Sequence, residues 1–166
     1  MRIRATLLLA VALQLLVAGA LRAQQLPRSD LSGTWVINIA KSHFGKLPPP
    51  TVDSVTITQM GNMYQFDATT DFGGQGRQHL VYKWPVGAGE ATNDVSGATV
   101  HTTITQHGDT LAVSSEVSMQ GQTVAVQSGR VYRSPDGKTM TREADIRPMA
   151  GPSTEPIHLL FVYDRK

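Results

Sequence analysis

The five histidines could do chemistry, because an imidazole nitrogen is a common metal ligand. His101 and His107 would lie about 20 Å apart on one extended strand, too far to share an ion. His79 and His101 would face each other if one hairpin centred near Glu90 joined them, with Cβ atoms about 5 Å apart. However, both positions fall on the polar faces of their strands, and no third ligand is indicated. We therefore expect solvated histidines and no metal site.

Glu143 and Asp145 form a carboxylate pair about 7 Å apart on one strand face. Glycosidases use paired carboxylates near this separation. Here Met140 and Ala144 would occupy the inner face of the same strand, which leaves the two carboxylates in solvent. A carboxyl group in bulk water keeps a pKa too low for acid catalysis, so the pair is predicted to be a surface feature.

Motifs of the familiar enzyme classes do not occur. The sequence has no G-x-S-x-G nucleophile elbow, no phosphate-binding P-loop and no H-E-x-x-H metal motif. It also contains no cysteine, which excludes disulfides, thiolate metal sites and a cysteine nucleophile. We therefore expect neither an enzyme nor a bound cofactor.

The remaining candidate function is the binding of a small molecule in an apolar interior. Small-molecule sites are usually apolar cavities with a few convergent polar groups. Alternation along the strands brings aromatic and aliphatic side chains to one face, with Thr102, Ser115 and Arg142 as polar exceptions. The residues predicted to line a ligand site are Trp35, Tyr64, Phe66, Tyr82, Trp84, Met140, Arg142 and Phe161. The same side chains could instead fill a small barrel completely, since about eight strands leave an interior only just wide enough to hold one ligand.

Arg142 is the polar exception that most needs a partner, because an unpaired guanidinium in the interior would be costly. Three partners are considered. A ring face such as that of Trp35 would make Arg142 structural, and arginine stacks well on aromatic rings. An inward carboxylate such as Asp67, or a bound anion such as a carboxylate with an apolar tail, would also neutralise it. A one-residue slip in register would turn it outward instead.

From Ser32 onward, hydrophobic residues recur with a period of two, which predicts about nine strands. These segments are rich in β-branched residues, as strands are. The residues that define them are Trp35 and Ile37; Val55 and Ile57; Tyr64 and Phe66; Leu80, Tyr82 and Trp84; Val100, Thr102 and Ile104; Leu111 and Val113; Val124 and Val126; Met140 and Ile146; and Ile157, Leu159, Phe161 and Tyr163.

Short turns connect most of these segments. Gly61-Asn62, Gly108-Asp109, Gln120-Gly121 and Pro135-Asp136-Gly137 have the composition of hairpin turns. Consecutive strands joined in this way are antiparallel. An antiparallel meander of eight to nine strands usually closes on itself, which removes exposed edges. The prediction is an all-β, up-and-down barrel, with a β-sandwich as the alternative.

Two segments interrupt the pattern. Asn38 to Gly45 is predicted to contain one helical turn, with Asn38 as the N-cap and Gly45 as the stop. The following Pro48-Pro49-Pro50 favours an extended connector. Ala88 to Gly97 is polar and is predicted to be a long loop.

Residues 1–23 have the pattern of a secretory signal peptide. Arg2 and Arg4 precede an apolar run, and Ala18-Gly19-Ala20 forms an A-x-A cleavage site; a cut after Ala23 is the alternative. The run is shorter than the roughly 20 residues of a membrane span, so no span is expected after signal removal. The remaining chain, residues 24–166, is predicted to be one domain that is periplasmic or secreted.

Signal removal also changes the charge balance. The full chain has 15 basic and 13 acidic side chains, and a cut after Ala20 removes Arg2 and Arg4, which equalises the two signs. No basic stripe remains, so nucleic acid is not an expected partner.

The first predicted strand opens with Gly33-Thr34-Trp35, directly after the predicted N-terminus of the mature chain. This resembles the G-x-W signature of the lipocalin and wider calycin barrels. The longer segment from Leu31 to Gly45 also resembles the opening of small secreted bacterial lipocalin-like proteins, a largely uncharacterised family. The resemblance implies a barrel in which Trp35 closes one end and a basic residue packs across it. Arg165 and Arg142 are the candidates for that residue.

The predicted function is that of an exported lipocalin-like protein that binds a small hydrophobic or amphipathic molecule inside the barrel. The alternative is a non-catalytic structural or protein-interaction module of the cell envelope, with a filled core. A co-purifying small molecule would distinguish the two.

Removal of the signal can be tested directly. Protein exported by cells that express the full sequence should begin at Leu21 or Gln24, which intact-mass measurement detects. Recovery of the full-length chain from the membrane fraction would contradict the prediction.

Overall fold

The computed structural model describes residues 30–72, 76–149 and 155–166, so the predicted signal peptide (residues 1–23) lies outside the described residues. The described chain forms ten antiparallel strands and one short 3-10 helix, η1 (Ile39–Lys41). The strands are β1 (Gly33–Ile37), β2 (Pro50–Met60), β3 (Met63–Phe72), β4 (Gln78–Pro85), β5 (Gly89–Val95), β6 (Ala98–His107), β7 (Thr110–Met119), β8 (Gln122–Arg133), β9 (Thr139–Pro148) and β10 (Ile157–Arg165).

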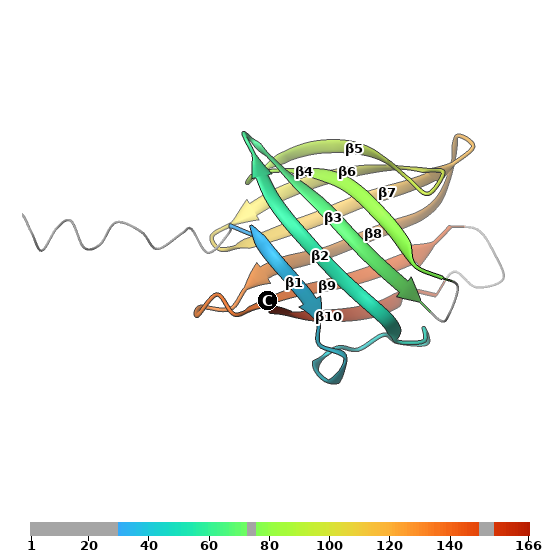
Figure 1. Ribbon diagram of the computed structural model, residues 1–166. Coiled ribbons are helices and arrows are strands. Elements are labelled where there is room, and N and C mark those ends of the chain that lie inside the picture. The colour runs from blue at the N-terminus through green and yellow to red at the C-terminus, as the bar shows by residue number, and fades with distance from the viewer. Residues whose placement is uncertain (1–29, 73–75, 150–154) are drawn as a thin grey trace, which may run out of the picture.

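All ten strands belong to one sheet that curls into a nearly closed barrel (Figure 1). Strands that follow each other in the sequence pair with each other, except β4 and β5, and β1 pairs with β10. The pairing of β1 with β10 joins the two ends of the meander. The predicted all-β meander and barrel are therefore confirmed, with ten strands instead of eight to nine, and the sandwich alternative is wrong.

The edges of the sheet, β4 and β5, meet at a seam without a backbone ladder. One side chain takes the ladder's place: Asn93 Oδ1 accepts a hydrogen bond from the Lys83 amide (2.7 Å), and Asn93 Nδ2 donates to the Lys83 carbonyl (2.9 Å). The side-chain amide of Asn93 thus acts as a peptide group would in a neighbouring strand.

The segment predicted to be a polar loop, Ala88 to Gly97, contains strand β5, so that prediction was wrong. The inward positions of β5 are Ala91, Asn93 and Val95, which give almost no apolar alternation. The main local signal for this strand is the turn that follows it. Ser96 and Gly97 both have positive φ (51° and 82°), the geometry of a two-residue hairpin turn that pairs Val95 with Ala98.

Because β5 lies between β4 and β6 in the chain, the predicted hairpin that joined His79 to His101 does not exist. His79 pairs with Thr69, and His101 pairs with Thr92 and Glu116. The two histidines therefore cannot share a metal ion.

The predicted turns are confirmed at Gly61, Gly108, Gly121 and Gly137, each of which has positive φ. The predicted helical turn is shorter than expected: Asn38 caps η1 by accepting a bond from the Lys41 amide (3.1 Å), but the helix ends at Lys41 and not at Gly45. Among the described residues, no helix is long and apolar enough to cross a membrane.

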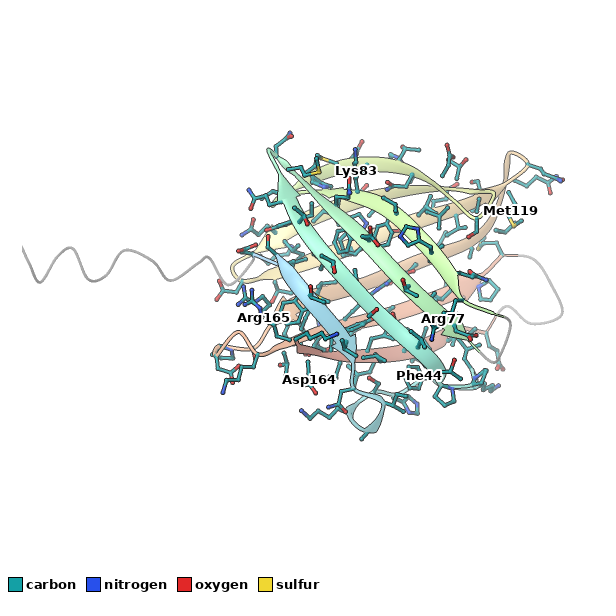
Figure 2. The ribbon with its side chains drawn as sticks, viewed as in Figure 1. Phe44, Arg77, Lys83, Met119, Asp164 and Arg165 are labelled. Atoms are coloured by element: carbon teal, nitrogen blue, oxygen red, sulfur yellow. The ribbon has the colours of Figure 1, made fainter. Side chains whose placement is uncertain are left out.

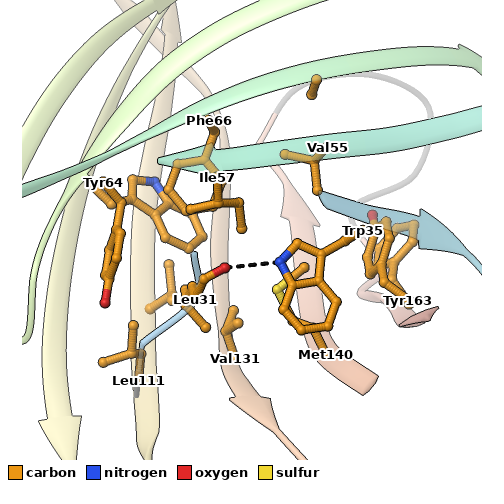
Figure 3. Packing of buried hydrophobic residues seen from close by; sticks show 14 of the residues in the cluster. Leu31, Trp35, Val55, Ile57, Tyr64, Phe66, Leu111, Val131, Met140 and Tyr163 are labelled. Atoms are coloured by element: carbon orange, nitrogen blue, oxygen red, sulfur yellow. Dashed lines mark hydrogen bonds between the residues drawn. The ribbon is translucent and has the colours of Figure 1, made fainter. Parts of the chain in front are cut away.

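Trp35 closes one end of the barrel. Its ring is 0% exposed, and its Nε1 donates a hydrogen bond to the carbonyl of Leu31 (2.9 Å; Figure 3). Leu31 folds under the barrel beside Tyr64 and Leu111, which completes the apolar plug (Figure 3). The sequence resemblance predicted such a closure.

Two arginines lie across the Trp35 ring. The guanidinium carbons of Arg165 and Arg133 are 5.4 Å and 5.8 Å from the ring centroid. Figure 2 shows Arg165 at one end of the barrel and Met119 at the other. Arg165 was one of the two predicted partners; Arg142, the other, does not contact the ring, and Arg133 was not predicted.

Position 33, two residues before Trp35, requires glycine. Its φ is +139°, and a Cβ placed on it would lie 3.1 Å from the Arg165 guanidinium. A side chain at position 33 would therefore be strained and would displace the arginine from Trp35.

Replacing Trp35 tests the importance of this plug. Trp35→Ala should lower the free energy of unfolding by about 3–5 kcal/mol, because it removes the largest buried side chain and leaves a cavity. Urea denaturation measures the loss. Val36→Ala is the matched control, since Val36 lies on the same strand and is exposed. A loss below about 1 kcal/mol for Trp35→Ala would contradict its role.

Candidate functional site

The interior of the barrel contains a cavity of about 300 Å³. Its wall is mainly aliphatic and aromatic, and it includes side chains from β2 through β10. The lining residues are Asp53, Val55, Phe66, Ala68, Thr70, Leu80, Tyr82, Trp84, Asn93, Val95, Val100, Thr102, Ser115, Val117, Gln127, Val131, Met140, Arg142, Ala144, Ile146, Leu159, Phe161 and Tyr163.

Three aromatic rings form one side of this wall. Phe66 on β3 stacks on Tyr82 of β4, with ring centroids 4.6 Å apart and planes 8° from parallel. Trp84 packs against both rings at 4.7 Å and 5.9 Å. The three positions meet because Phe66 and Tyr82 are directly paired across the ladder and Trp84 is two residues farther along. The result is a rigid apolar surface.

The structure brings six of the eight predicted ligand residues to the cavity wall: Phe66, Tyr82, Trp84, Met140, Arg142 and Phe161. Trp35 and Tyr64 do not line it. They belong to the plug beneath the cavity, beside Leu31 and Leu111.

The strand predicted from Val124 and Val126 is β8, and Val126 lies on its outer face, where it is 36% exposed. In β8 the cavity is instead lined by Gln127 and Val131. A register shift in the β7/β8 ladder at Val117 and Ser118 disturbs the alternation near the start of β8.

Arg142 lies in the wall, on the strand neighbouring Phe161. The two residues are directly opposite in the β9/β10 ladder, and the guanidinium carbon lies 5.8 Å from the Phe161 ring centroid. The aromatic partner is therefore Phe161 and not Trp35. The inward register predicted for Arg142 is confirmed.

Asp53 is a second side chain of charged type in the wall, and it was not among the predicted site residues. Asp53 is buried, and its Oδ2 accepts a hydrogen bond from the Tyr163 hydroxyl (3.0 Å). It lies on the same face of β2 as Val55 and Ile57, so the period-two pattern could have revealed it. Asp67, the carboxylate named as a possible partner of Arg142, faces outward between Phe66 and Ala68 and contacts His79 (2.8 Å).

The bond between Asp53 and Tyr163 forms at the end of β1. Ile37, the last residue of β1, pairs with Tyr163 in β10, and the last partner of β1 in β2 is Ser54, the residue after Asp53. The two side chains therefore meet where the β1/β2 ladder ends. The connector then continues along β10, where His43 pairs with Leu160 and Phe44 packs edge-on against Phe161 (5.8 Å).

Burial is the largest effect on the pKa of both partners in this bond. Burial is the largest effect on the pKa of Asp53 and raises it, although the Tyr163 hydroxyl and the positive charge of Arg142 act in the opposite direction. Burial, followed by the negative charge of Asp53, raises the pKa of Tyr163 well above its usual range. Tyr163 is thus a neutral hydroxyl that donates to Asp53.

Three hydroxyl side chains also reach the interior. Thr102 and Ser115 satisfy each other through a bond of 2.9 Å between their hydroxyls. Thr70, which is paired with Asp53 across the β2/β3 ladder, is buried, and its Oγ1 has no hydrogen-bond partner among the described residues. Thr102 and Ser115 were predicted to face inward, whereas Thr70 was not.

The outer surface carries the other candidate groups. Glu143 accepts bonds from Arg130 Nε (2.7 Å) and the Tyr132 hydroxyl (3.0 Å), and Asp145 contacts His158. Both carboxylates are outside the barrel, as predicted. Within residues 30–72, 76–149 and 155–166, no three histidines or carboxylates are placed to hold a metal ion.

No protein-family model and no curated protein matches the chain. Solved structures do. Lipid binding protein 8 of Caenorhabditis elegans aligns with 86% of this chain and 100% of its own, at 6% identity and a TM-score of 0.55. Rv2717c of M. tuberculosis aligns with 82% of this chain and 92% of its own, at 18% identity and a TM-score of 0.54. Fatty-acid-binding protein 1 of Echinococcus granulosus aligns with 81% of this chain and 96% of its own, at 9% identity and a TM-score of 0.50.

These similarities establish the fold. The chain has the same β-barrel fold as these proteins, and a barrel is what the Gly33-Thr34-Trp35 opening predicted.

Asp53→Asn tests the electrostatics of the wall. A buried acid whose pKa is raised destabilises the folded state wherever it is ionised, and this cost disappears once the acid is protonated in both folded and unfolded chains. The variant should therefore be at least as stable as the wild type at neutral pH. Its advantage should shrink as the pH falls toward and below the ordinary carboxyl pKa of 3.8.

Urea denaturation across this pH range measures the difference, with Asp67→Asn as the control on the outer face. An advantage of Asp53→Asn that grows on acidification would contradict the assignment.

Proposed function

We propose that this lipocalin-like barrel binds one small, partly apolar molecule in its interior. The observation that carries the proposal is the cavity of about 300 Å³, with its wall of Phe66, Tyr82 and Trp84 and its few polar groups. Ligand sites in proteins are built in this way, and their volumes begin at about 300 Å³.

The size of the cavity argues against the alternative of a filled core. Protein interiors are packed about as densely as organic crystals, with few voids larger than a water molecule. A cavity of about 300 Å³ is far larger than the space that one water molecule needs, so the surrounding side chains do not fill the interior.

The comparisons support the same proposal. Two of the similar barrels are named as a lipid binding protein and a fatty-acid-binding protein. Arg2, Arg4 and the Ala18-Gly19-Ala20 site support export, so we propose that binding takes place in the periplasm or outside the cell. We propose no catalytic step.

Probe binding tests this function. The purified protein should bind N-phenyl-1-naphthylamine, a small apolar fluorophore, with enhanced and blue-shifted emission. Val117→Phe places a larger side chain in the cavity wall and should weaken binding at least about tenfold, or about 1.4 kcal/mol. Val81→Phe is the matched control, because Val81 is exposed on the outer face of β4 and the same change there should have no effect.

Native mass spectrometry of protein purified from its own host should also show a bound small molecule in stoichiometric amount. Absence of both the co-purifying molecule and probe binding would support the structural or protein-interaction module.

A further inference from the structure

We propose that the occupant of the cavity carries no net charge: an apolar body with an uncharged hydrogen-bonding head group, such as an alcohol or an amide, and not a carboxylate. This inference rests on the proposed function and names the chemical class of its ligand. It comes from the balance of charges and hydrogen bonds around Asp53 and Arg142.

The wall contains one acidic and one basic side chain. Of the described residues that line the cavity, Asp53 and Arg142 alone are of a charged type, and their formal charges are opposite; the other polar members are hydroxyl and amide side chains. Their charges are close enough to interact, since the positive charge of Arg142 lowers the pKa of Asp53 against the effect of burial. The formal charges of the wall therefore balance. A carboxylate or an ammonium would bring one uncompensated charge into a largely apolar space, which is costly.

The hydrogen-bonding groups also disfavour a carboxylate. Tyr163 has one hydroxyl proton, and it is donated to Asp53 Oδ2 (3.0 Å). A ligand carboxylate would have to share Arg142 with Asp53 while lying near a like charge. Selection between ligands would then come from repulsion by Asp53 as much as from attraction by Arg142.

A neutral head group meets complementary partners at the same place. A carboxylate can accept about four hydrogen bonds, so Asp53 retains acceptor sites beyond the one that Tyr163 uses. Arg142 supplies donors. Thr70, directly opposite Asp53, is only 8% exposed, and its Oγ1 lacks a partner among the described residues. A buried hydroxyl without a partner is unfavourable, and a ligand that both donates and accepts would satisfy it.

Two ligands that share a ten-carbon chain and differ in the charge of the head group test the inference. Affinities for decan-1-ol and decanoate would be measured at pH 7 by displacement of N-phenyl-1-naphthylamine, and their ratio is the readout. The wild type should bind decan-1-ol at least about tenfold more tightly than decanoate. Asp53→Asn leaves Arg142 as an uncompensated cation and should reverse the preference, with decanoate gaining at least about tenfold. Asp67→Asn, the same change on the outer face of β3, should leave the ratio unchanged.

Thr70→Val provides a second test that does not alter charge. It should weaken decan-1-ol several-fold relative to decane, because the alcohol loses a partner that decane never uses. Circular dichroism verifies the fold of each variant.

A wild type that prefers decanoate, or an Asp53→Asn variant with an unchanged ratio, would overturn the inference while leaving the proposed function intact. If neither the probe nor either ligand binds the wild type, the proposed function and the inference both fail.

Discussion

The pairing of β1 with β10 is the interaction on which the rest of the structure depends. These strands come from opposite ends of the described chain, and their ladder turns an open meander into a barrel with an inside. The ladder is short, so side chains reinforce it. Trp35 bonds to Leu31 beneath it, and Arg165, the residue opposite Trp35, folds back across the indole where Gly33 leaves room. The plug and the closure of the barrel are therefore one piece of architecture.

The candidate site adjoins the end of the same strand. Tyr163 pairs with Ile37, the last residue of β1, and its hydroxyl donates to Asp53 of β2, the strand on the other side of β1. Asp53, one of the two charged side chains of the described cavity wall, is therefore held beside the strand that closes the barrel.

Much of this organisation follows from the sequence because a strand has a simple rule. Side chains alternate, so Phe66, Trp84, Met140 and Phe161 could be assigned to the interior one strand at a time. The same rule places Asp53 in the interior, because it shares a face of β2 with Val55 and Ile57. Strand β5 was missed because its inward residues are small or polar, and its turn at Ser96-Gly97 is the main local signal.

The alternation of side chains along a strand does not predict which residues of distant strands contact each other. Whether Arg133 or Arg142 reaches Trp35 depends on how the strands tilt around the barrel, and nothing near either arginine in the sequence records it. The same is true of the bond between Tyr163 and Asp53, which are 110 residues apart. Such contacts depend on how the barrel closes, and the assignment of individual strands does not reveal them.

The seam between β4 and β5 has a consequence for self-association. A strand edge with unpaired backbone groups can recruit a strand from another molecule and begin an intermolecular sheet. In this barrel the two edges face each other, and Asn93 occupies the backbone groups of Lys83 that a foreign strand would otherwise use. Any change that loosens the seam uncovers two edges at once. Aggregation, before any loss of secondary structure, would be its first sign.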